Sequence, residues 1–471
     1  MKRFIAVCLT LCLLLATAPM TALAAGKGDI NNDGAVNTMD ARSMLRALLT
    51  GDSFTQQEIW WGDYTIDDAI DTADARVLLK SLLGGEAVTS VNYANPTTEN
   101  YWGERAITLL GDSISFGVGA SDPLPETSYV SYVKKAVQAA NGGNLNYGFT
   151  SAYAGHWQPN NFAFELHSWP THSVFSDGTP QWICDNIDKG TRLTSVAMIS
   201  ESPWSWITYK LREAYASEYE YFTVYYHVEP NAAHFCIADG NGGEVPDING
   251  SKAYINTAAP DGVSEYTTRT AFYRLADCPK DENGLPKITI CHDGTESPVS
   301  ITGIGYYKDI TDNGVTFNSF TRGGLSLLVL SDTVLQQTAK SDTLIFALGY
   351  NDVASFADRV IAGEFAAKID RMIALCKANG TKVIVNDVTW HQDFDAAGKI
   401  LQAQTIVRSE LRRFAREMGG IYINQPALLG QSILDDLNTK GDGIHPSSDG
   451  MRLVAKQVVD AMGLTWTEDW T

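Results

Sequence analysis

Four polar residues in this sequence have the types and positions that nucleophilic acyl transfer requires. Ser113 ends an apolar run in the turn Gly-Asp-Ser, and Asn351 ends another in Gly-Tyr-Asn-Asp. Asp442 and His445 stand three positions apart in Asp-Gly-Ile-His. That spacing lets the carboxylate hold one ring nitrogen while the other ring nitrogen faces a serine hydroxyl. Ser113, His445 and Asp442 are therefore candidates for nucleophile, base and orienting acid.

The elements that must position these residues alternate between buried strands and helices. Continuous apolar runs rich in β-forming residues indicate strands that are covered on both faces, as in parallel sheets. Open sheets of this kind collect their chemistry at the carboxyl ends of the strands. We expect strands at 106–110, 145–150, 343–348, 381–386 and 420–423, and helices at 129–140, 403–418 and 450–462.

The four blocks resemble the SGNH (GDSL-type) hydrolase family, whose motifs read Gly-Asp-Ser, Gly, Gly-x-Asn-Asp and Asp-x-x-His. The resemblance covers about 104–150 and 321–463, roughly half of the chain. It implies a flavodoxin-like parallel sheet and a Ser-His-Asp ester hydrolase that needs no cofactor for catalysis. It also implies an oxyanion hole built from the backbone N–H groups of Ser113 and Gly324 and the side chain of Asn351, with Gly323 as the alternative glycine.

Composition limits the class of protein. A chain of 471 residues exceeds one ordinary domain, so we expect two or three. The formal net charge of −20 argues against nucleic acid and anionic membranes as partners. The sequence contains no Cys-x-x-Cys or His-x-x-His cluster, so it gives no indication of a transition-metal site.

The N-terminus has the form of a secretory signal peptide. Lys2 and Arg3 precede a largely apolar run, and Ala22-Leu23-Ala24 supplies a small-residue cleavage site. We expect residues 1–25 to be removed and the mature protein to be extracellular. No other apolar run reaches about 18 residues, so nothing else is expected to span a membrane. Five cysteines remain, from which we expect at most one disulfide: Cys184, Cys236, Cys278, Cys291 and Cys376.

The chain then repeats itself. Residues 28–51 and 62–85 share 12 of 24 positions at a period of 34. The first copy places oxygen donors at positions 1, 3, 5, 9 and 12 of a loop with glycine at position 6, which is the spacing that wraps ligands around Ca²⁺. The second copy departs from it, with Thr65 at position 3 and Asp68 in place of the glycine. A small module of this kind should need calcium to fold.

The duplicated loop and helix resemble a type I dockerin. The resemblance implies a cohesin on a scaffold protein as partner, with Thr38, Met39, Thr72 and Ala73 at the recognition positions. It implies structural calcium held by two sets of residues: Asp29, Asn31, Asp33, Ala35, Asn37 and Asp40 in the first loop, and Asp63, Thr65, Asp67, Ala69, Asp71 and Asp74 in the second.

A long insertion interrupts the hydrolase pattern. Between 151 and 320 helical periodicity nearly vanishes, and short alternating or aromatic runs recur between turn signals, which favours a β-sandwich. Its tryptophans are either core residues or a platform for sugar rings, and core is the commoner use: Trp157, Trp169, Trp182, Trp204 and Trp206. His156 and Trp157 are alternatives for lining the catalytic cleft. The loop with Trp390 and His391 either lines the substrate pocket or is structural, and a structural role is at least as common.

The predicted order is signal peptide 1–25, dockerin 27–86, linker 87–103, hydrolase domain 104–150, inserted β-sandwich 151–320 and hydrolase domain 321–471. This order predicts a secreted, cellulosome-associated esterase that removes acetyl groups from plant wall polysaccharide, with xylan, xyloglucan, mannan and pectin all open. The alternatives are a non-catalytic carbohydrate-binding subunit on a hydrolase fold, a lipase-like esterase, and, more remotely, a peptidase.

Overall fold

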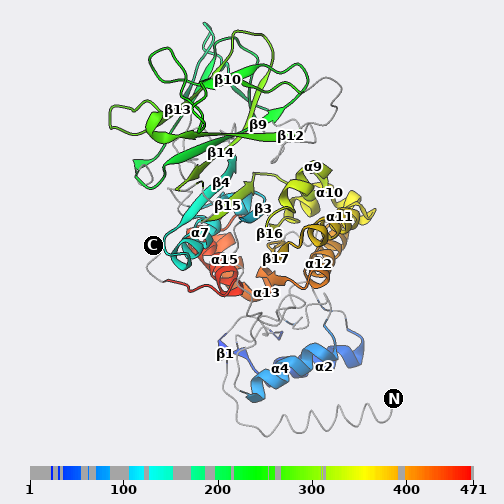
Figure 1. Cartoon of the computed structure of the whole chain (residues 1–471). Helices are drawn as coiled ribbons and strands as arrows, with labels where there is room; N and C mark the ends of the chain where they lie inside the picture. The colour runs from blue at the N-terminus through cyan, green and yellow to red at the C-terminus, as the bar shows by residue number, and fades with distance from the viewer. Residues whose placement is uncertain are drawn as a thin grey trace.

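We describe the protein from a computed structural model, which covers residues 23–24, 30–31, 35–52, 54, 62, 70–84, 106–120, 127–151, 171–185, 197–213, 217–252, 254–259, 267–308, 310, 314–390 and 398–467. Within these residues no helix combines the length and the apolar character needed to cross a bilayer. Figure 1 shows the arrangement of the elements.

Six parallel strands form the centre of the molecule, in the spatial order β4-β15-β3-β16-β17-β18. They are β3 (Ala106–Gly111), β4 (Leu145–Ser151), β15 (Val315–Thr321), β16 (Thr343–Ala347), β17 (Lys382–Asp387) and β18 (Ile421–Asn424). The prediction of an α/β fold with a parallel sheet is confirmed.

Helices cover both faces of this sheet (Figure 1). One group comprises α5 (Ser113–Phe116), α7 (Tyr129–Ala140), α13 (Gln425–Leu429), α14 (Gln431–Thr439) and α15 (Ser448–Ala461). The other comprises η2 (Leu327–Val329), α9 (Asp332–Thr338), α10 (Tyr350–Ile361), α11 (Glu364–Asn379) and α12 (Lys399–Glu417).

Strand β16 shows why these strands read as unbroken apolar runs. Ile345 belongs to the core that includes Val133 of α7 and Val454 of α15. Its neighbours Leu344 and Phe346 belong to the core formed with α9 to α12. Because successive side chains point to opposite faces and both faces are covered, each position must be apolar.

The insertion adds antiparallel strands to the same sheet. Chain segments of the insertion extend the central sheet as β12-β9-β14 beyond β4, with β7 and β6 beside β14. A separate sheet has the order β11-β10-β13-β8-β5. The elements are β5 (Thr171–His172), β6 (Ile183–Asp185), β7 (Ala197–Ser200), β8 (Trp206–Lys210), β9 (Tyr221–Val228), β10 (His234–Ile237), β11 (Ile255–Asn256), β12 (Thr267–Arg274), η1 (Leu275–Asp277), β13 (Lys287–His292) and β14 (Val299–Tyr307).

Strand β15 lies inside the range predicted for the insertion but pairs in parallel with β3 and β4. The parallel sheet therefore resumes at Val315, before residue 321. Antiparallel pairing of β14 with β4 makes one continuous sheet from the insertion to the nucleophile strand. Strand pairing is non-local, and the alternating pattern of β15 gives no sign of which partners it takes.

The described tryptophans of the insertion divide into two kinds. Trp182 is 1% exposed and belongs to the core, whereas Trp204 and Trp206 are 70% and 38% exposed. The ring of Trp204 lies over Gly294, where a β-carbon would come within 2.4 Å of the indole. Trp157 and Trp169 lie outside the described residues.

Two cysteines of the insertion face each other. Cys236 of β10 and Cys291 of β13 are direct cross-strand partners. Both are free thiols, as are Cys278 and Cys376. Burial raises the pKa of the Cys278 thiol and of the Cys376 thiol to about 12, which keeps both protonated and unreactive.

The duplicated segment forms two helices of equal length, α2 (Thr38–Thr50) and α4 (Thr72–Gly84), which pack together. Strands β1 (Leu23–Ala24) and β2 (Ala35–Val36) pair beside them, with β1 inside the predicted signal peptide. The two helix starts have matching geometry. Asp40 accepts from the backbone N–H of Asn37 at 2.7 Å, and Asp74 accepts from that of Asp71 at 2.8 Å.

Six of the twelve predicted calcium ligands are described, namely Asn31, Asn37, Asp40, Asp71, Asp74 and the backbone of Ala35. Asp40 and Asp74, at position 12 of each loop, are both 0% exposed. Buried carboxylate oxygens suit a hard cation such as Ca²⁺. Asp29, Asp33, Asp63, Thr65, Asp67 and Ala69 lie outside the described residues, and the described ones alone form no cluster of three acidic, histidine or cysteine ligands.

Candidate active site

Ser113 begins a short helix directly after β3. Asp112 caps this helix, because its Oδ1 accepts from the Ile114 backbone N–H at 3.0 Å. Only glycine fits at the preceding position 111, because a β-carbon on Gly111 would lie 2.1 Å from Ser115 Oγ. The sequence Gly-Asp-Ser thus makes a tight strand-to-helix turn that holds Ser113 at the carboxyl end of the sheet.

The structure brings Ser113, His445 and Asp442 together across 332 residues of sequence. Ser113 Oγ lies 2.9 Å from His445 Nε2, and His445 Nδ1 lies 2.8 Å from Asp442 Oδ2. The histidine side chain is 15% exposed and the aspartate 56%. The three groups form a continuous chain of hydrogen bonds from hydroxyl to carboxylate.

Asp442 also fixes the backbone of its own loop. Its Oδ1 accepts from the N–H groups of Ile444 at 3.0 Å and His445 at 2.7 Å. Partial burial raises the pKa of Asp442, but the hydrogen bonds from His445 and Ile444 outweigh burial and hold it below the usual value. The carboxylate therefore stays ionised opposite the imidazole.

Other elements brace the same loop. Trp390, 0% exposed at the end of the segment after β17, donates from Nε1 to the Ile444 carbonyl at 2.9 Å. Asp436 of α14 accepts from the backbone N–H of Ser447 at 2.8 Å. Of the two residues for which the sequence left a pocket-lining and a structural role open, Trp390 is buried and braces the histidine loop, and His391 lies outside the described residues.

Gly119 packs directly on the histidine. Its φ is +92°, and a β-carbon there would lie 2.7 Å from His445 Cβ and 2.7 Å from the Pro446 carbonyl oxygen. We expect Gly119→Ala to displace the imidazole and lower kcat/KM on a small acetyl ester by on the order of 10²-fold, the cost of misplacing a reacting group by about 1 Å. Gly142→Ala is the matched control, because Gly142 has φ +63° and no atom within 4 Å of an added β-carbon. Equal losses in both variants would show that backbone strain, and not contact with His445, is responsible.

The predicted oxyanion glycines lie in a turn next to the nucleophile. Leu325 N–H bonds the Arg322 carbonyl at 3.2 Å, and Arg322 N–H bonds the Gly111 carbonyl at 3.3 Å. Gly324 has φ +71°, which the third position of a type II turn requires. Within the described residues, the backbone N–H groups of Ser113 and Gly324 have no hydrogen-bond acceptor.

Asn351 projects from the start of α10 into this site. Its Nδ2 donates to the Leu325 carbonyl at 3.1 Å and, over a longer 3.4 Å, to Asp112 Oδ2. The first bond ties the amide to the turn that carries Gly324. The second is weak by its length, so the hydrogen that makes it is available to a stronger acceptor.

Asp352, the last residue of the Gly-x-Asn-Asp block, holds the start of η2, which follows this turn. Its two carboxylate oxygens accept from the backbone N–H groups of Leu327 and Leu328, each at 3.0 Å. Burial raises the pKa of Asp352 to about 6, against the lowering effect of these bonds. Burial likewise raises the pKa of Asp112 to about 7, with a further rise from the nearby Asp352.

These raised pKa values predict how stability varies with pH. Both acids hold a proton in the folded chain at pH values where the unfolded chain, with a pKa near 3.8, has lost it. Stability is therefore greatest below the unfolded pKa and falls as pH rises from about 4 to about 7. We expect Asp352→Asn to flatten this fall in the free energy of unfolding measured by urea titration across the range. An unchanged slope would contradict the prediction.

Sequence reasoning found the three reacting residues and Asn351, but missed four residues that support them: Asp112, Gly119, Asp352 and Asp436. Asp112 and Asp352 are part of the Gly-Asp-Ser and Gly-Tyr-Asn-Asp motifs, so their positions in these motifs could have identified them as supporting residues. The contact of Gly119 with His445 spans 326 positions of chain and leaves no trace in local sequence. His156 and Trp157 lie outside the described residues.

No family model and no curated protein matches the sequence. Among solved structures, a peptidoglycan O-acetylesterase superposes with a TM-score of 0.51 at 14% identity, over 79% of this chain and 97% of that one. A lipase/acylhydrolase from Enterococcus faecalis gives a TM-score of 0.25 at 17% identity, over 33% and 80% of the two chains. A family two carbohydrate esterase from Clostridium thermocellum gives 0.20 at 12% identity, over 59% and 95%. This chain therefore shares the fold of the peptidoglycan O-acetylesterase structure over most of its described length.

Proposed function

We propose that this protein is a secreted serine esterase that removes acetyl groups from wall polysaccharides. The single observation that carries the proposal is the hydrogen-bonded chain from Ser113 Oγ through His445 to Asp442 at the carboxyl end of the parallel sheet. A serine hydroxyl, an imidazole and a carboxylate in this order perform acyl transfer on unrelated folds, so the geometry supports the chemistry independently of the fold.

In the proposed mechanism Ser113 Oγ attacks the acetyl carbonyl carbon while His445 Nε2 accepts the hydroxyl proton. Asp442 keeps the other ring nitrogen protonated and stabilises the imidazolium. The tetrahedral intermediate collapses when His445 returns the proton to the departing sugar oxygen. Water, deprotonated by His445, then attacks the acetyl-serine, and acetate leaves as Ser113 regains its proton.

The developing oxyanion is proposed to lie among three donors. These are the backbone N–H groups of Ser113 and Gly324, which find no acceptor among the described residues, and the Asn351 amide. An oxyanion is a stronger acceptor than the Asp112 oxygen 3.4 Å away, so the amide hydrogen should turn to it during the reaction.

Asn351→Ala should lower kcat by roughly 10²–10³-fold, the cost of one oxyanion donor, with little change in KM. The reason is that the amide binds charge that exists only in the transition state. Steady-state kinetics on a small chromogenic acetate measure this. Asn379→Ala on α11, whose amide bonds only the Leu375 carbonyl in the described residues, is the control and should stay at wild-type rate. A loss confined to KM would remove Asn351 from the oxyanion site.

The wider context extends the proposal to substrate and location. The duplicated loop-helix segment is proposed to be a dockerin that binds calcium and a cohesin, and the N-terminus a signal peptide. An enzyme carried in this way to a wall-degrading assembly would meet acetylated xylan, xyloglucan, mannan or pectin. The rival role, a carbohydrate-binding subunit without catalysis, predicts binding to these polymers with no acetate released.

Acetate release from each of these acetylated polymers, with Ser113→Ala as the blank, tests the proposal. O-acetylated peptidoglycan belongs in the panel, because a peptidoglycan O-acetylesterase shares the fold. Release from any plant polymer above the blank supports the proposed substrate class. Release from peptidoglycan alone would support the esterase activity but show that its substrate is peptidoglycan and not a plant polysaccharide. No release from any member, with a folded protein, would leave the non-catalytic role.

A further inference from the structure

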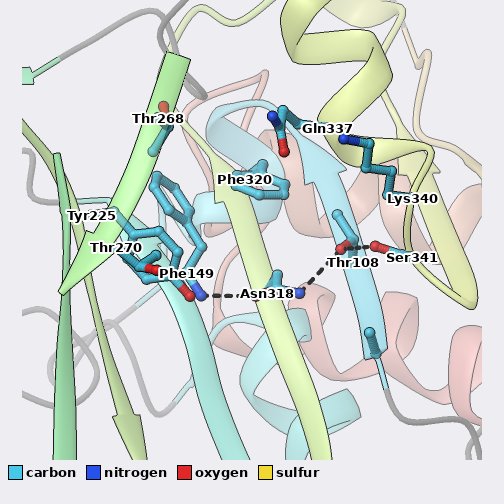
Figure 2. Close-up of a pocket in the computed structure, with 11 residues that line it drawn as sticks. Thr108, Phe149, Tyr225, Thr268, Thr270, Asn318, Phe320, Gln337, Lys340 and Ser341 are labelled. Atoms are coloured by element: carbon cyan, nitrogen blue, oxygen red, sulfur yellow. Dashed lines mark hydrogen bonds between the residues drawn. The ribbon is translucent and has the colours of Figure 1, made fainter. Parts of the chain in front are cut away.

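A cavity of about 250 Å³ lies where the insertion meets the parallel sheet, apart from Ser113 (Figure 2). It is bounded by the face of β3, β4 and β15, by β9 and β12 of the insertion, and by the end of α9 with the residues that follow it. Thr108 lies at its floor, five residues before Ser113 on the nucleophile strand. Five residues of strand span about 16 Å, so a ligand in the cavity does not reach the triad.

One wall of the cavity is aromatic. Phe149 of β4 packs against Tyr225 and Phe320, with ring centroids 5.1 and 4.5 Å apart. Figure 2 shows the three rings together along the sheet. Phe149 is 0% and Phe320 6% exposed, so both rings lie behind the wall. The half-buried Tyr225 supplies the accessible ring face, on which the C–H face of a sugar can rest.

The floor is polar but already satisfied. Asn318 accepts from the Phe149 backbone N–H at 2.8 Å and donates to Thr108 Oγ1 at 3.3 Å, while Thr108 also bonds Ser341 (Figure 2). These bonds hold the base of the cavity in one arrangement, so its shape exists before any ligand binds.

The rim, in contrast, carries hydrogen-bonding groups that the protein does not use. The Thr268 hydroxyl oxygen is buried and has no hydrogen-bond partner. Rotation about its Cα–Cβ bond exchanges the methyl and hydroxyl positions and can present the hydroxyl to the cavity. Gln337 and Lys340 reach the same space from α9 and the turn after it, and their side chains form no hydrogen bond or ion pair with the described residues.

The chemistry of the lining identifies the ligand class. Hydroxyl and amide groups both donate and accept, as sugar hydroxyls do, and an aromatic wall complements a sugar ring. A purely apolar ligand would leave these groups unsatisfied, and a phosphate would need more than one cation. Among the described residues that line the cavity, Lys340 is the one charged side chain and none is a carboxylate, in a protein of net charge −20.

We propose that this cavity binds a single sugar ring of a polysaccharide, with preference for a ring that carries a carboxylate. The volume is below the ~300–1,000 Å³ of clefts that take drug-sized ligands, which suits one ring of a longer chain. The cavity would hold the polymer on the protein while the triad acts on another part of it. The binding itself does not depend on esterase activity.

The test measures binding to the full-length Ser113→Ala protein by isothermal titration calorimetry, with trigalacturonate and xylotriose as probes. Both should bind, and trigalacturonate should bind more tightly. Lys340→Gln should lower the affinity for trigalacturonate by about two- to fivefold, the effect of losing an exposed ion pair, and leave the affinity for xylotriose unchanged. Lys280→Gln, an exposed lysine beside the five-stranded sheet, is the matched control and should change neither.

Thr268→Val keeps the shape of the side chain and removes its hydroxyl. It should lower the affinity for both probes by roughly two- to tenfold, the effect of one hydrogen bond. The melting temperature of the free protein should stay the same or rise. A purely structural hydroxyl would instead lower the melting temperature. Absence of binding by both probes, or binding that neither variant alters, would overturn the proposal.

The two proposals can fail separately. Hydrolysis of a small acetate ester reports on the triad alone, and Lys340→Gln and Thr268→Val in the otherwise wild-type chain should leave it unchanged. If the protein binds the probes but hydrolyses no ester, the sugar-site proposal stands and the esterase proposal fails. The reverse result would keep the esterase and lose the sugar site.

Discussion

Replacing Ser113 by alanine should reduce turnover of a small acetyl ester by roughly 10⁴–10⁶-fold, the range seen when a serine hydrolase loses its nucleophile. The hydroxyl 2.9 Å from His445 Nε2 is the atom that would bond the acyl carbon, and alanine has nothing to replace it. Folding should be unaffected, because the described contacts of the Ser113 side chain are limited to His445. Steady-state kinetics on the purified variant, with far-UV circular dichroism as a folding check, measure the effect.

Ser115 supplies the control, because it is the other serine of the same turn. Its hydroxyl is buried and bonds Tyr129 at 2.6 Å, away from the imidazole. Ser115→Ala should lower the melting temperature and keep most of the activity. A fluorophosphonate should label wild type and Ser115→Ala once and leave Ser113→Ala unlabelled. Labelled Ser113→Ala, or full activity in it, would remove Ser113 as the nucleophile.

Asp442→Asn should have the second largest effect. The asparagine oxygen can keep the hydrogen bonds from the Ile444 and His445 backbone, which turns the amide NH₂ toward His445 Nδ1. The imidazole must then accept at Nδ1 and carry its proton on Nε2, where it cannot take a proton from Ser113. That wrong tautomer costs on the order of 10⁴-fold in kcat in serine hydrolases with a buried aspartate.

Asp442 is 56% exposed, so water can partly replace the carboxylate, and we expect a loss below that limit. Kinetics on the same ester measure it, with Asp449→Asn as control, since Asp449 is an exposed acid of the next helix that pairs with Lys440. An Asp442→Asn enzyme within twofold of wild type would show that the histidine needs no carboxylate. The triad would then reduce to a serine–histidine pair.

Local patterns were enough to predict the elements that carry the site. The helix expected at 129–140 begins and ends at those residues, and the strands expected near 343 and 382 are β16 and β17. Such elements show in sequence because both faces of each strand are buried and because helix α7 has one apolar face. The triad was predictable for another reason, namely that Ser113, Asn351 and His445 each follow or precede an element at the same sheet edge.

What could not be predicted depends on contacts between distant segments. The placement of β15 between β4 and β3 follows from pairing partners, which an alternating strand does not encode. The sequence left both a pocket-lining and a structural role open for Trp390, and its burial with a hydrogen bond to the distant Ile444 carbonyl decides for the structural one. The exposure of Trp204 beside the burial of Trp182 is likewise decided by tertiary packing.

The antiparallel pairing of β14 with β4 bears on how this protein could be engineered. A shortened version lacking the inserted strands would strip β4 of a neighbour and leave its backbone amides and carbonyls open to pairing with other molecules. Minimal versions of the enzyme should therefore aggregate, and useful trimming must start from the far edge of the insertion, at β12, and work inward.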